Sequence, residues 1–156
     1  MSILVLSLVS VSAFAVNENA ISEHCGAIKE TLVNLQHQDS RTRVYLGRYY
    51  ETILNTYIVP LNLRLVENSI SHNELMDNQT SFSNKRQEFV SDYINYQKDL
   101  EDLVASNCES EPGTFYQKLQ NTRVKRQTVA NDVVKMRSLI KKQVELVKKL
   151  KEGITE

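Results

Sequence analysis

The 156-residue sequence has few of the residues that make turns, cross-links and metal sites: four glycines, two prolines, two cysteines and no tryptophan. So few glycines and prolines argue against a fold of many short strands joined by tight turns. Two cysteines are too few for a disulfide-framework miniprotein or a four-ligand zinc site. The 19 basic and 19 acidic residues cancel, so the excess of positive charge expected of a nucleic-acid-binding domain is missing.

Long apolar runs are also scarce, and the one that exists lies at the N-terminus. Residues 3–15 read ILVLSLVSVSAFA and end in a small-x-small pattern typical of a signal-peptidase site. This run is short of the roughly 20 residues that a membrane span needs. We therefore predict a signal peptide at 1–15, although no Lys or Arg precedes the run and cleavage near Ala20 is an alternative. The expected location is secreted, periplasmic or cell surface.

What the mature chain has is helical periodicity. Its apolar residues recur at spacings of three and four, as in helices with a narrow seam. A polar segment at 67–73 and a segment at 108–113 that contains both Pro112 and Gly113 divide the pattern into three. Pro60 should kink the first part, since proline lacks a backbone N–H. The expected helices are about 19–66, 73–107 and 114–152.

We expect these helices to form one all-α domain over 16–156, an elongated antiparallel three-helix coiled-coil bundle. The second and third helices should each be roughly 55 Å long. Cys25 and Cys108 support the hairpin formed by the first two, because the midpoint of their numbers falls at residues 66 and 67, beside the polar turn. In an oxidising compartment they should form a disulfide that clamps the open end of this hairpin. The alternatives are free thiols or a bridge between chains.

Several polar residues occupy seam positions, and three of them fall at one level of the expected bundle. The hairpin register places Asp39 near Tyr96, and the register of the second and third helices places Tyr96 opposite Arg126. We predict a buried polar layer of these three residues, whose simplest role is to fix the register. A functional site there is the alternative. The seven tyrosines similarly suit half-buried helix flanks, or a contact surface for a partner.

The neutral total hides an uneven distribution of charge. Residues 16–112 carry 8 basic and 15 acidic residues, whereas residues 113–156 carry 11 basic and 4 acidic residues. The simpler interpretation is that a basic third helix packs along two acidic ones. The alternative is a basic amphipathic tail that contacts anionic lipid or another envelope component. Its lysines are Lys141, Lys142, Lys148, Lys149 and Lys151.

Signatures of catalysis and of cofactor binding are missing. The three histidines are widely separated, and no glycine-rich phosphate loop or complete nucleophilic triad occurs. We expect no catalytic residues, no metal, no cofactor and no nucleic-acid partner. Asn78-Gln79-Thr80 matches a glycosylation sequon, which has meaning only in a eukaryotic source.

A set of short motifs resembles uncharacterised short secreted helical proteins of candidate-phyla-radiation bacteria. The motifs are Leu35-Gln36, Asp39-Ser40-Arg41-Thr42-Arg43, Leu46-Gly47, Tyr50-Glu51, Pro60-Leu61-Asn62 and Phe115-Tyr116. The resemblance covers most of the mature chain and implies a secreted helical protein, but it carries no activity or site residues. The sequence thus favours a secreted or cell-surface, non-enzymatic helical binding or structural module with an unknown protein or envelope partner. Oligomerisation is compatible with this reading, and contact with a membrane surface through the basic tail is the alternative.

Overall fold

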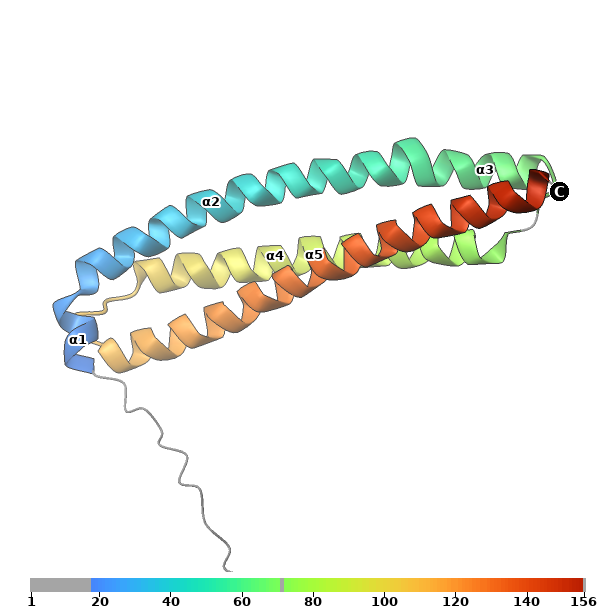
Figure 1. Ribbon diagram of the computed structural model, residues 1–156. Coiled ribbons are helices and arrows are strands. Elements are labelled where there is room, and N and C mark those ends of the chain that lie inside the picture. The colour runs from blue at the N-terminus through green and yellow to red at the C-terminus, as the bar shows by residue number, and fades with distance from the viewer. Residues whose placement is uncertain (1–17, 71, 156) are drawn as a thin grey trace, which may run out of the picture.

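A computed structural model describes residues 18–70 and 72–155 of the chain. All of its regular elements in these ranges are helices, which confirms the expected all-helical class. They are α1 (Glu18–Glu23), α2 (Cys25–Thr52), the π-helix η1 (Ile53–Ile58), α3 (Val59–Glu67), α4 (Asn73–Ala105) and α5 (Pro112–Thr155). Figure 1 shows an elongated molecule in which α2 to α3 form one long arch beside α4 and α5.

The first helical stretch differs from the single helix kinked at Pro60 that the sequence predicts. A turn at His24 separates α1 from α2, and it lets α1 lie across the start of α5, where the Glu18 carboxylate approaches Gly113. The irregularity before Pro60 is a π-helix that precedes the proline, in which Val59 N–H donates to Leu54 O. A π-turn shifts the hydrogen-bond pattern by one residue, and such a shift accommodates a residue without an N–H in a continuous helix.

The chain reverses direction just after α3, at the position that the cysteine numbers indicate. Ser69 has φ 55°, in the left-handed region. Ile70 N–H donates to Leu65 O at 2.8 Å, and Ser69 N–H donates to Val66 O at 3.0 Å. These two bonds are the Schellman pattern, in which the left-handed residue satisfies the last carbonyls of a helix. A serine holds the place that glycine usually occupies.

Helices α4 and α5 pack closely along their length, and α2 supplies much less of the core. Eight residues of α4 are buried, at spacings of three, four and seven: Leu75, Asn78, Phe82, Phe89, Tyr93, Tyr96, Leu100 and Leu103. In contrast, α2 buries Cys25, Leu32 and Tyr50, and no residue from 33 to 49 is buried. The α4 and α5 seams therefore form the body of the bundle, and α2 is attached to it.

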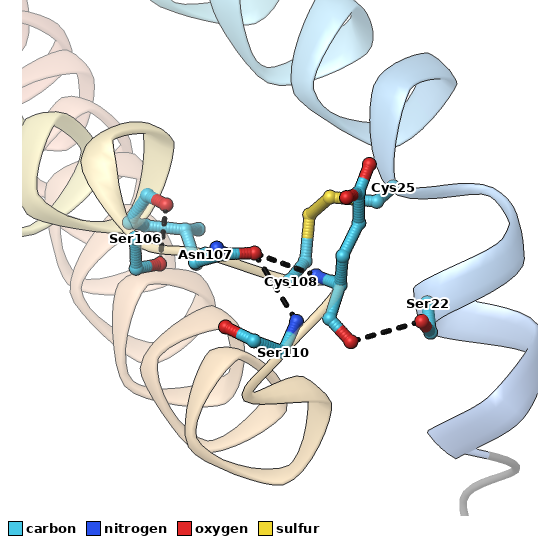
Figure 2. The surroundings of a disulfide bond; sticks show 8 residues. Ser22, Cys25, Ser106, Asn107, Cys108 and Ser110 are labelled. Atoms are coloured by element: carbon cyan, nitrogen blue, oxygen red, sulfur yellow. Dashed lines mark hydrogen bonds between the residues drawn. A yellow bond between two sulfur atoms is a disulfide. The ribbon is translucent and has the colours of Figure 1, made fainter.

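The Cys25–Cys108 disulfide, expected from the sequence, is present at one end of the bundle. Both cysteines are buried, beside Leu103 and Phe115, and their Cα atoms are 5.5 Å apart. Figure 2 shows the bridge between the start of α2 and the connection from α4 to α5, where Ser22 Oγ donates to the carbonyl of Glu109 at 3.0 Å. The bridge thus fixes the N-terminal end of α2 to the other helices.

Removing the bridge should lower the stability of the protein strongly. In the chain-entropy model, a cross-link with a sequence separation of 83 restricts the unfolded chain by about 4.5 kcal/mol. We expect C25A/C108A to lose about this amount of unfolding free energy in urea titrations. Intact mass should rise by about 2 Da on reduction of the wild type. A free energy within about 1 kcal/mol of wild type would contradict the proposed role of the bridge.

The turn after α3 offers a substitution that should stabilise the protein. Ser69 occupies the left-handed region, which costs an L-residue about 1 kcal/mol relative to glycine. Ser69→Gly should therefore raise the unfolding free energy by about 0.5 kcal/mol, after allowance for the larger entropy of glycine in the unfolded chain. Ser69→Ala, which keeps the Cβ atom, is the matched control and should give no gain in thermal unfolding.

Candidate functional site

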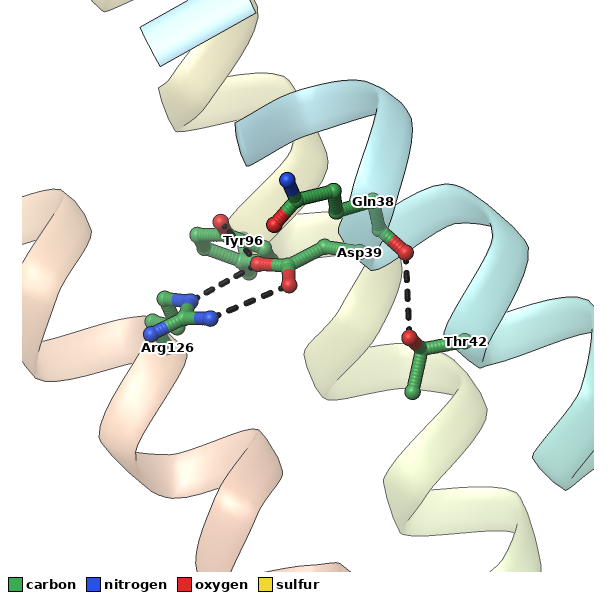
Figure 3. Close-up of polar contacts among 5 residues, drawn as sticks. All are labelled: Gln38, Asp39, Thr42, Tyr96 and Arg126. Atoms are coloured by element: carbon green, nitrogen blue, oxygen red, sulfur yellow. Dashed lines mark hydrogen bonds and ion pairs between the residues drawn. The ribbon is translucent and has the colours of Figure 1, made fainter. Parts of the chain in front are cut away.

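The structure brings Asp39, Tyr96 and Arg126 together at mid-bundle, where one side chain comes from each of α2, α4 and α5 (Figure 3). Tyr96 Oη donates to Asp39 Oδ2 at 2.7 Å. Arg126 Nε donates to the same oxygen at 2.7 Å, and Arg126 Nη2 donates to Asp39 Oδ1 at 3.0 Å. This bidentate contact matches the planar geometry of guanidinium and carboxylate, so it restricts the relative position of the two side chains as well as pairing their charges.

The layer is less buried than the sequence suggests. The phenol of Tyr96 is covered, with 1% of the residue exposed. The side chain of Asp39 is 18% exposed, however, and that of Arg126 is 51% exposed. The expectation of a fully buried layer is therefore wrong for Arg126, because α2 stands away from α5 at this level and leaves the guanidinium open to solvent.

The electrostatics of the layer hold all three groups in one protonation state. Burial opposes the ionisation of Asp39, but hydrogen bonds from Arg126 and Tyr96 outweigh it and lower its pKa below 3.8. Burial and the neighbouring Asp39 carboxylate raise the pKa of Tyr96. The hydrogen bond to Asp39 raises the pKa of Arg126. Asp39 is thus an ionised acceptor at neutral pH and is poorly suited to take up a proton.

A groove of about 590 Å³ begins at this layer and follows the gap between α2 and α5. We call it the central groove. Its lining is partly apolar, with Leu46, Phe89, Tyr93, Val129 and Val133. Four arginines also line it: Arg43, Arg123, Arg126 and Arg137. The volume lies within the roughly 300 to 1,000 Å³ of small-molecule sites.

The groove exists because α2 has no buried side chain beside it. Ala130 of α5 contributes little volume at the same level, and Arg43 of α2 lies over the ring of Tyr93, at 5.4 Å from its centroid. This cation–π contact holds one arginine at the groove wall. Sequence reasoning missed Arg43, Arg123 and Arg137, although Arg137 follows Arg126, Ala130 and Val133 at spacings of four, three and four on one face of α5.

The lysines of the proposed basic tail lie apart from the groove, at the far end of α5. Lys141, Lys142, Lys148, Lys149 and Lys151 are all exposed. Leu146 and Leu150, however, pack against Leu65 and Leu75 inside the bundle. The bundle core therefore covers part of the apolar side of the proposed amphipathic tail, on which Val144 is 50% exposed.

The structure also buries polar residues that could not be identified as buried from the sequence. Asn78 is 1% exposed, and its amide donates to Leu139 O at 3.1 Å and to Gln143 Oε1 at 2.8 Å. The amide of the sequon asparagine is thus buried in the core and engaged in hydrogen bonds there. Asp132 is 4% exposed and pairs with Lys85 at 3.2 Å, while burial raises its pKa. Buried positions are predicted from the spacing of apolar residues. Asn78 and Asp132 are polar and interrupt that spacing, so the sequence does not indicate that they are buried.

Several exposed tyrosines form a second surface feature on α2 and η1. Tyr45 and Tyr57 are 68% and 65% exposed. Tyr45 stacks on Tyr49, with ring planes 7° apart. In contrast, Tyr93 and Tyr96 belong to the core. The tyrosines therefore divide between packing and surface.

Among residues 18–70 and 72–155, no cluster of three or more histidines, cysteines or carboxylates is arranged to hold a metal ion. Within the same part of the chain, no helix combines the length and apolar character needed to cross a bilayer. No protein-family model matches the chain, and comparison with curated proteins and with solved structures gave no match either. The central groove is therefore the candidate site on geometry alone.

The pH dependence of stability should report the Asp39 layer. A carboxylate with a lowered pKa stabilises the fold above its unfolded value of 3.8, and this contribution is lost as the pH falls through the lower folded value. Asp39→Asn should cost about 1 to 2 kcal/mol at neutral pH. It should also flatten the decline in stability between about pH 5 and pH 2.

Urea unfolding across this pH range measures both effects. The matched control is Asp99→Asn, which removes a partly exposed pair between Asp99 and Lys125 that makes one contact, at 2.7 Å, in place of the two made by Arg126. Such surface pairs contribute about 0 to 1 kcal/mol, so the control should lose less and keep the wild-type pH profile. Equal losses in the two variants would show that the Asp39 layer is an ordinary surface contact.

Proposed function

We propose that this protein is an exported, non-enzymatic helical module that binds an envelope-associated acidic ligand through the central groove. The disulfide supports export, because such bonds persist mainly in oxidising compartments. The apolar N-terminal segment supports a cleaved signal peptide, and it lies outside the described residues.

The finer fold that accompanies this proposal is an antiparallel three-helix coiled coil. The spacing of buried residues in α4 supports it, as does the run of α4 in the opposite direction to α2 and α5. A coiled coil of this kind is rigid and long, and its surface grooves run parallel to the axis.

The observation that carries the binding function is the arginine-rich lining of the groove. Arg126 is neutralised by Asp39, whereas Arg43, Arg123 and Arg137 form no ion pair among the described residues. A concave, partly apolar surface with several unneutralised cations favours a ligand of complementary charge. Because Asp39 is already engaged and ionised, the groove supports binding in preference to proton-transfer chemistry.

The alternative site is the set of exposed lysines near the C-terminus, acting on an anionic membrane or wall polymer. The neighbouring apolar residues Leu146 and Leu150 pack in the core. A membrane contact by these lysines would therefore be electrostatic, without insertion of apolar side chains into the bilayer. A purely electrostatic contact of this kind weakens steeply with salt. The groove offers both charge and apolar area, and we therefore favour it.

Co-sedimentation of the mature chain with envelope fractions separates the two sites. R43E/R137E reverses two charges of the central groove, and K148E/K149E reverses two charges of the exposed tail. If the groove binds the ligand, R43E/R137E should weaken co-sedimentation by about tenfold or more, and K148E/K149E should retain it. The opposite pattern would reject the groove in favour of the tail, and wild-type binding by both variants would reject both sites.

A further inference from the structure

The central groove combines an apolar floor with cationic walls, and the combination restricts the chemistry of its ligand. Phe89, Val129 and Val133 supply carbon surface to the floor, and Leu46 closes it from α2. An aliphatic group placed there leaves water for an apolar surface, which is favourable. A small inorganic anion would leave this floor unused.

The arginines that line the groove favour a negatively charged group on the ligand. Arg126 is committed to Asp39 by two hydrogen bonds, so it is a poor site for another carboxylate. Arg137 has no carboxylate partner among the described residues and lies at the opposite end of the α5 lining. It is close enough to the buried Tyr50 to oppose, in part, the rise in the pKa of that phenol caused by burial. Tyr50 Oη meets no strict hydrogen-bond geometry within the described chain, and Arg137 is the polar group that it faces.

The dimensions of the groove favour a thin ligand. Its α5 lining runs from Arg123 to Arg137, a length of about 21 Å at the helical rise. A volume of about 590 Å³ over that length gives a mean cross-section of roughly 28 Å². The groove is long and narrow, which favours a single extended chain over a bulky compact ligand.

An extended peptide meets a different obstacle. Each of its residues carries a backbone N–H and C=O that must find partners when removed from water. Thr42 and Gln127 line the groove and can pair with a few of these groups, but Phe89, Val129 and Val133 provide no partner. An aliphatic chain has no such requirement, so it satisfies the floor, the walls and the cross-section together.

On these grounds we propose that the central groove binds a free fatty acid, with its carboxylate at Arg137 and its aliphatic chain along the floor toward Arg126. The proposal rests on the proposed function, because it names the acidic ligand of the same groove. Arg123 and Arg137, at the two ends of the α5 lining, both lack an ion pair among the described residues; we place the carboxylate at Arg137 because this arginine lies beside the buried Tyr50 and the apolar lining extends from it toward Arg126.

Titration with cis-parinaric acid, a fluorescent fatty acid, tests the proposal on the mature disulfide-bonded chain. We expect saturable binding that palmitate displaces and that methyl palmitate, which lacks the charge, displaces about tenfold more weakly or worse. In a series of saturated fatty acids, each added methylene should strengthen competition by about two- to fourfold until the groove is full. A soluble short-chain phosphatidylglycerol, below the concentration at which it forms micelles, should compete poorly, because it carries two chains.

Two variants with matched controls locate the binding. Arg137→Gln should weaken cis-parinarate binding by about tenfold or more, whereas Lys135→Gln removes an exposed charge outside the groove and should have no effect. Ala130→Phe fills the groove without changing charge and should abolish binding. Val124→Phe places the same ring at a position that is 66% exposed and outside the groove, and it should bind normally.

Absence of saturable binding overturns the proposal, as does equal competition by methyl palmitate or wild-type affinity in both Arg137→Gln and Ala130→Phe. Circular dichroism and thermal unfolding of each variant separate loss of the site from loss of the fold. The proposed function can survive this failure. If envelope co-sedimentation depends on Arg43 and Arg137 but no fatty acid binds, the groove has a different acidic ligand; if neither is observed, both proposals fail.

Discussion

The shortage of apolar residues along α2 is the constraint on which the rest of the structure depends. Between residues 33 and 49 this helix fully buries no side chain, and Leu46 packs only partly against the core, so hydrophobic burial holds its middle weakly. It is held mainly at separate points: the disulfide at Cys25 with the nearby buried Leu32, the polar contact of Asp39, and the buried Tyr50. The central groove occupies the interval that this attachment leaves between α2 and α5.

Each point of attachment has a different physical character. The disulfide acts mainly on the unfolded chain, and its effect does not depend on pH at ordinary values. The Asp39 contact with Tyr96 and Arg126 depends on ionisation. It specifies one register of the helices, because only one geometry allows both hydrogen bonds from the guanidinium. Tyr50 packs edge-on against Phe82 and Phe89, which adds aromatic contacts to its burial. Together they hold a helix that its own seam would hold weakly.

Some of the charged residues of α5 pair with other helices as α5 packs, whereas others are not used in this way. Lys125 and Arg126 of this basic helix meet Asp99 and Asp39, and the acidic Asp132 meets Lys85 of α4. These pairs explain part of the opposite balances of the two segments of the sequence. Arg123 and Arg137 are not used in this way, and they lie at the groove, where charge is available for a ligand.

The sequence by itself determined the helical class, the position of the reversal after residue 67 and the pairing of Cys25 with Cys108. Periodicity and the numbering of cysteines in a hairpin are local or one-dimensional, so they can be read without coordinates. The same register arithmetic grouped Asp39, Tyr96 and Arg126. The tertiary structure decided how far apart the helices stand, which depends on the size and shape of every facing side chain at once.

The separation between the helices accounts for the features that could not be predicted from the sequence. The spacing pattern places Leu35 and Leu46 in a seam along α2. Neither is buried, because α4 and α5 pack mainly against each other. The exposure of Arg126, the central groove and the burial of Asn78 all follow from this asymmetric packing. The π-helix before Pro60 has a local origin instead, since it accommodates a residue without an N–H in the continuous arch of α2 and α3.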